Sequence, residues 1–79
     1  MEEIDVVARF ESGGEITPLE LVRKGALYRV ISTGRSWRGK KGVHILVMLI
    51  GNRVLHLLFS MPDAKWYLVD DTHNGMTTM

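Results

Sequence analysis

The residues best suited to acid–base chemistry in this 79-residue chain are three histidines, at positions 44, 56 and 73. His44 and His56 lie in one long apolar stretch, which we expect to form a β-hairpin with Gly51-Asn52 as a two-residue turn. Facing residues in such a hairpin have numbers that sum to 103, and this register places the two histidines on opposite faces. We therefore predict that they do not share a metal ion.

Asp70, Asp71 and His73 offer oxygen and nitrogen ligands near the end of the chain, where the composition predicts a flexible polar tail. The sequence contains no nucleophile motif, phosphate-binding loop or zinc-binding pattern. We therefore predict no catalytic residue, no metal site and no cofactor, and a protein that is not an enzyme.

Basic residues surround an aromatic one in the segment "GRSWRGKKG", residues 34–42, whose three glycines predict a long exposed loop. Small β-barrels bind single-stranded nucleic acid with cations that follow the phosphates and rings that stack on bases. This pattern predicts a nucleic-acid site at Arg35, Trp37, Arg38, Lys40 and Lys41. In the structural alternative, an acidic first strand neutralises these cations and Trp37 folds back as a lid on the core.

The net charge is only +1, but the acidic and basic residues are unevenly distributed along the chain. Residues 1–20 hold six acids and one arginine, whereas residues 21–62 hold eight lysines or arginines and no acid. The acidic start "MEEIDVV" is unlike a secretory signal, and no apolar run reaches the roughly 18 residues of a membrane helix. With no cysteine in the chain, we expect a cytoplasmic protein that does not enter a membrane.

The elements that would carry these residues have the length of β-strands. "IDVVARF" alternates apolar and polar residues, and glycines and prolines divide the remainder into short segments. Residues 17–24 fit either a short helix or a strand that ends in an "RKG" hairpin turn, and we favour the strand. We predict an all-β fold: one small antiparallel meander or SH3-like barrel of five or six strands, over residues 1–70, with residues 71–79 as the tail.

The hairpin of residues 43–50 and 53–60 would be apolar on both faces, so its outer face needs a cover. The cover is another segment of this chain, a second copy in a homodimer, or a partner protein. We predict a non-catalytic binding or assembly module, in which Val47→Glu abolishes self-association without unfolding the chain. The predicted interface residues are Ile45, Val47, Leu49, Val54 and Leu58.

The segment "VRKGALYRVISTGRSWRG", residues 22–39, resembles a small bacterial family of unknown function. Its pattern is a basic residue and glycine, then Tyr-x-Val, then a tryptophan, here Arg23, Gly25, Tyr28, Val30 and Trp37. "KWYLVD", residues 65–70, also fits the family, whereas Val22 stands where a tryptophan is common. The resemblance implies a compact bacterial β-domain with no assigned activity, and some relatives occur near DNA-repair functions.

Overall fold

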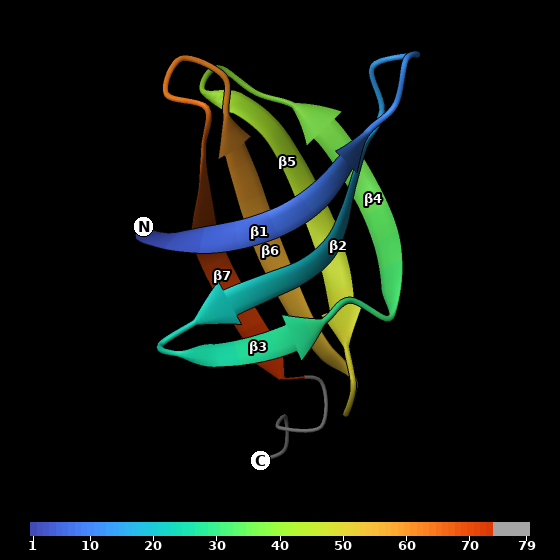
Figure 1. Cartoon of the computed structure of the whole chain (residues 1–79), viewed down its shortest axis with the longest axis vertical. Helices are drawn as coiled ribbons and strands as arrows, with labels where there is room; N and C mark the ends of the chain where they lie inside the picture. The colour runs from blue at the N-terminus through green and yellow to red at the C-terminus, as the bar shows by residue number, and fades with distance from the viewer. Residues whose placement is uncertain (74–79) are drawn as a thin grey trace.

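The computed structural model describes residues 1–73 and shows an all-β chain, with no helix among these residues (Figure 1). There are seven strands, where we predicted five or six, and the SH3-like topology stays a prediction. The strands are β1 (Glu2–Phe10), β2 (Ile16–Arg23), β3 (Ala26–Arg29), β4 (Ser32–Arg38), β5 (Gly42–Leu49), β6 (Arg53–Ser60) and β7 (Lys65–His73).

The seven strands form one antiparallel sheet in the order β3-β2-β1-β7-β6-β5-β4. Pairing of β1 with β7 joins two meanders, one of three strands and one of four. Figure 1 shows the sheet curled into a half-barrel, with β1, β2 and β3 crossing in front of the other four strands. The four-stranded part therefore has an inner face, which β1–β3 cover, and an outer face.

Residues 17–23 lie in a strand, as we favoured, because β2 pairs with both β1 and β3. Lys24 and Gly25 lie between the paired residues Arg23 and Ala26, with φ of 51° and 80°. Positive φ at both central residues is typical of the tight hairpin turns that match the twist of the strands. The "RKG" turn predicted from the sequence is confirmed.

The predicted loop at residues 34–42 is wrong, because β4 continues to Arg38 and only residues 39–41 form the turn. β4 lies at an edge of the sheet, where only one side of the strand must find hydrogen-bond partners. Such edges tolerate glycines and favour basic residues, which discourage pairing with other chains. A composition typical of a loop is thus compatible with an edge strand.

The predicted register of the β5–β6 hairpin is wrong by one residue. Leu49 pairs with Arg53, so facing residues sum to 102, and the turn holds Ile50 as well as Gly51 and Asn52. A shift of one residue moves every side chain of one strand to the other face relative to its partner. The five predicted interface residues consequently do not share a face.

Three of those five residues lie in the core on the inner face. Ile45, Val47 and Leu49 are 0%, 1% and 3% exposed. They pack in one cluster with buried side chains from β1, β2, β6 and β7, namely Ile4, Leu21, Leu55, Leu57, Trp66 and Leu68. Val54 and Leu58, the other two predicted interface residues, belong to the outer face.

An ion-pair network joins four strands at one end of the inner face. Arg53 of β6 donates two hydrogen bonds to the Asp71 carboxylate, at 2.7 and 3.0 Å, and Arg23 of β2 donates a third at 2.8 Å. Arg23 also donates to Glu2 of β1 at 3.2 Å. The hydrogen bonds from Arg53 lower the pKa of Asp71 most, and the hydrogen bond from Arg23 lowers it less.

Asp71 and Thr72 belong to β7, so the predicted boundary after residue 70 is wrong. Asp71 faces Leu55 of β6 and holds the network described above. The ion pairs, rather than an apolar pattern, keep this polar end of the strand in the sheet. Residues 74–79 of the predicted tail lie outside the described residues.

Candidate functional site

The outer face of β4–β7 carries a row of side chains that crosses four strands. Trp37 of β4 faces His44 of β5, which faces Leu58 of β6, which faces Tyr67 of β7. Directly opposed residues point to the same side of a sheet, so all four belong to the outer face. Trp66, the neighbour of Tyr67, is 7% exposed in the core, as expected for adjacent strand residues.

His44 and His56 are hydrogen-bonded on this face, although we predicted them on opposite faces. Their Nδ1 and Nε2 atoms lie 2.8 Å apart, because the one-residue change of register makes them diagonal neighbours. One ring nitrogen must donate a proton and the other accept it. The structure therefore brings together the two histidines that sequence reasoning separated.

Trp37 packs over this histidine pair. Its ring centroid lies 5.2 Å from that of His44, with an interplanar angle of 4°, and 5.2 Å from that of His56. Trp37 is still 38% exposed. The tryptophan covers a part of the outer face, and not the core as the lid alternative required, while it keeps an edge in solvent.

The surroundings of the histidine pair lower the pKa of His56. Burial lowers the pKa of His56, and a charge on His44 would lower it further, whereas Asp70 on the facing position of β7 acts in the opposite direction. No cluster of three or more metal-ligating side chains occurs in the part of the chain that the structure describes. The pair can exchange a proton, but no third side chain completes a metal site beside it.

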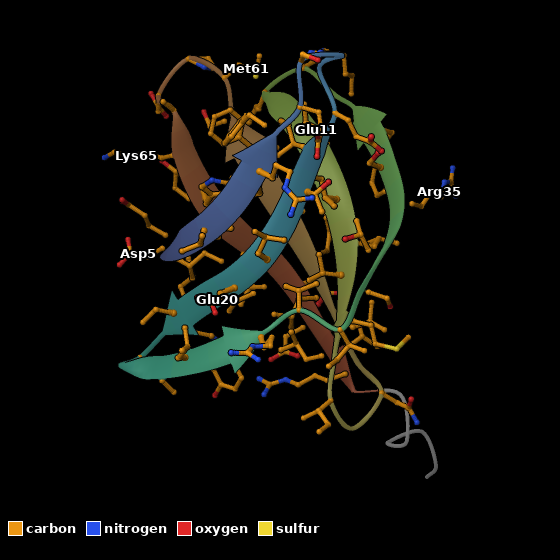
Figure 2. The ribbon with its side chains drawn as sticks, turned by 45° about the vertical axis from the view of Figure 1, so that its right-hand side comes forward. Asp5, Glu11, Glu20, Arg35, Met61 and Lys65 are labelled. Carbon is orange, nitrogen blue, oxygen red and sulfur yellow. The ribbon has the colours of Figure 1, made fainter. Side chains whose placement is uncertain are left out.

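The five predicted nucleic-acid residues do not lie on one surface. Arg35 lies over the Trp37 ring, with its guanidinium carbon 5.6 Å from the ring centroid, and Figure 2 shows its side chain projecting away from the sheet. Arg38 faces Val43 on the inner side, where it lines a hollow together with Glu11 and Glu15. Arg38 is therefore not part of the candidate site on the outer face.

Lys40 and Lys41 line a groove of about 430 Å³ at the end of the row just described. The groove lies between the turn of residues 39–41 and the turn of residues 61–64, and the buried Leu58 lies within it. Its remaining lining residues are Met1, Ser60, Pro62, Asp63 and Tyr67. The groove and the Trp37–His44 stack are neighbours on the outer face, because Leu58, which lines the groove, faces both His44 and Tyr67.

The acidic first strand reaches only the Tyr67 end of this row, where Glu3 of β1 faces Tyr67, and among residues 1–73 it forms no ion pair with Arg35, Lys40 or Lys41. Glu2 pairs with Arg23, and Glu3 lies 3.8 Å from Lys65. Figure 2 shows Asp5 and Lys65 on the opposite side of the molecule from Arg35. Arg9, Arg29 and Arg53 also have carboxylate partners, whereas within residues 1–73 no carboxylate lies within 4.0 Å of Arg35, Lys40 or Lys41.

Sequence reasoning missed His44, His56 and Asp63 as members of this site. The two histidines could have been found by testing a three-residue turn at residues 50–52 beside the two-residue turn. Asp63 carries no local signal, because its place opposite the lysines depends on how two separate turns meet.

Comparisons of the chain with protein-family models, curated proteins and solved structures find no match. The resemblance to a bacterial β-domain family therefore stays a prediction. Within the described residues no helix has the length and apolar character needed to span a membrane.

Proposed function

We propose that the protein binds single-stranded nucleic acid, without catalysis, on the outer face of β4–β7. The observation that carries the proposal is the position of three cations, Arg35, Lys40 and Lys41, on both sides of the Trp37–His44 stack. Among residues 1–73 these three have no carboxylate within 4.0 Å, and neither do Lys24 and Arg38, which lie away from the stack. A cation that the fold does not neutralise is available to a phosphate. Ring faces beside it are suited to unpaired bases, which a duplex would not present.

The row of side chains suggests the path of the strand. Trp37 and Tyr67 stand three strands apart, which corresponds to about 14 Å at the usual strand spacing. One base can pack against the exposed part of the Trp37 ring and another beside Tyr67, with the buried Leu58 beneath the path between them. The phosphates would then pass Arg35 at one end and the two lysines at the other.

The direct test is the anisotropy of a labelled (dT)12 strand titrated with the protein at several salt concentrations. Three phosphate contacts on a single strand predict a slope of about 2 for log Kd against log salt concentration. Trp37→Ala should weaken binding about tenfold, because one base loses its stacking partner. Absence of binding at about 50 mM salt would refute the proposal.

Arg35 and Arg38 provide a matched pair of variants, since they are three residues apart on the same strand and face opposite sides. Arg35→Gln should reduce the salt slope by about 0.7, the contribution of one phosphate contact. Arg38→Gln removes the same charge from the inner side and should leave the slope unchanged. Equal effects of both variants would mean that only net charge matters, and not this site.

Self-association through the same face is a second candidate, favoured by its apolar strip. Leu46, Met48 and Val54 are only half-buried and lie together on the outer face of β5 and β6, whereas the neighbouring Leu58 is buried. Sedimentation velocity at tens of micromolar should then show a dimer that Met48→Glu dissociates. A monomer for the unmutated chain would eliminate this candidate and leave the nucleic-acid proposal intact.

A further inference from the structure

The groove beside Tyr67 holds charges of both signs at its rim. Lys40 and Lys41 come from the turn of residues 39–41, and Asp63 comes from the turn of residues 61–64. Within residues 1–73, neither lysine forms an ion pair with Asp63 within 4.0 Å. A ligand in this groove therefore meets donors on one side and an acceptor on the other.

Asp63 retains most of its capacity to accept hydrogen bonds. The Ser60 hydroxyl donates to its Oδ2 atom at a long 3.3 Å, and the Asp63 residue is exposed. An ionised carboxylate has about four acceptor positions on its two oxygens and can accept two parallel donors at once. The Ser60 contact ties the carboxylate to the end of β6, directly beside the groove.

We propose that this groove recognises a guanine base of the bound strand, an inference that rests on the proposed nucleic-acid function. Guanine carries two adjacent donors, N1–H and N2–H, which match the two oxygens of Asp63. Its O6 and N7 atoms are acceptors, which match the ammonium groups of Lys40 and Lys41. Tyr67 and the apolar Leu58 and Pro62 provide the surface against which the ring lies.

The other bases fit this arrangement less well. Adenine and cytosine each present one amino group beside a ring nitrogen that is itself an acceptor, so a carboxylate there meets a lone pair. Thymine and uracil present a single N–H between two carbonyl groups. Guanine alone has two neighbouring donors for a carboxylate together with two neighbouring acceptors for ammonium groups.

The groove also lies where a neighbouring nucleotide would arrive. Leu58 links it to the Trp37–His44 stack, so a strand with one base on the stack can place another in the groove. The stack has no side chain with this donor and acceptor pattern and accepts any base. Specificity is therefore expected at one nucleotide of the bound segment and not along its whole length.

The test compares (dT)12 with strands in which one central thymine is replaced by guanine, inosine or adenine, at fixed salt concentration. The guanine strand should bind about tenfold more tightly than (dT)12, because a bidentate contact discriminates to this degree. The inosine base lacks the N2 amino group, so the inosine strand should bind about threefold more tightly than (dT)12. The adenine strand should bind no more tightly than (dT)12. Equal binding of all four strands would refute the guanine site and leave the proposed function standing.

Asp63→Asn should abolish the preference for guanine while it leaves the affinity for (dT)12 unchanged or slightly higher. Asp5→Asn is the matched control, because Asp5 is an exposed acid on β1 whose loss changes the net charge equally. The control should keep the full preference. A uniform loss of affinity for every strand in Asp63→Asn would overturn the guanine site, and failure of all strands to bind would refute the proposed function itself.

Discussion

The two faces of β5 and β6 have similar apolar compositions but different surroundings. On the inner face, Ile45, Val47 and Leu57 are at most 1% exposed beneath β1–β3. On the outer face, Leu46, Met48 and Val54 are half-buried among themselves and their polar neighbours. The arginines also differ in their partners: Arg23 and Arg53 are held by carboxylates, whereas among residues 1–73 no carboxylate lies within 4.0 Å of Arg35 on the outer face or of Arg38 on the inner side.

This difference shows which residues the fold needs and which it leaves available. A side chain that is buried or fully paired contributes to the free energy of folding, and its loss should unfold the chain. A half-exposed ring or an unpaired cation contributes little to stability. The outer face can therefore be changed without loss of the fold, which makes the comparison testable.

The largest expected effect comes from a charge placed on the inner face of β5, compared with the same charge on its outer face. Val47→Glu should lower the free energy of unfolding by about 4 kcal/mol or more, because it leaves an unpaired carboxylate in the core. This corrects our expectation from the sequence, in which the same variant stayed folded. Met48→Glu, one residue away on the outer face, should cost less than about 1 kcal/mol, and urea denaturation followed by circular dichroism measures both.

Loss of Asp71 should have the next largest effect, because two arginines would lose their partner. The pairs are only about one-quarter exposed, so Asp71→Asn should lower the free energy of unfolding by about 2 kcal/mol. The stabilisation is present above the ordinary aspartate pKa and is lost as the pH falls through the lowered pKa of Asp71. The unmutated protein should therefore lose stability below about pH 4 more steeply than the variant. Parallel curves would contradict this role.

A smaller effect is expected from the titration of His56. Its pKa lies below 6.5, so the folded state holds fewer protons than the unfolded chain at mildly acidic pH. The corresponding stabilisation is complete above pH 6.5 and is lost as the pH falls through the lowered pKa. An NMR titration of the ring protons should show this pKa, and His44→Gln should raise it toward the ordinary value. An unchanged pKa in the variant would mean that the two rings do not interact electrostatically.

The smallest effect should follow from Gly39→Ala on the outer face. A Cβ atom at this position would lie 2.8 Å from Nε2 of His44, so the ring must shift. We expect a stability loss under about 1 kcal/mol, since the end of one side chain can move. The displaced ring should weaken oligonucleotide binding about twofold to threefold, measured by anisotropy. Unchanged binding would show that the His44 position does not matter to the ligand.

Much of the fold follows from local patterns in the chain. The strand at residues 16–23 and its Lys24-Gly25 turn agree with alternation and with the conformational freedom of glycine. The β5–β6 hairpin was also predicted, but its predicted register was wrong by one residue, and so was the assignment of side chains to its faces. Two candidate turns at residues 50–52 differ by a single residue, and a hairpin that is apolar on both sides contains no signal to choose between them.

By itself, the sequence determined the all-β class of fold and the concentration of basic residues around Trp37. These features depend on neighbours along the chain and on short-range backbone preferences. Only the tertiary structure decided that His44 meets His56, that Arg38 turns inward and that Asp63 stands opposite Lys40 and Lys41. Each of those contacts joins residues from different strands or turns, so each depends on register and on how the sheet curls, which local composition does not encode.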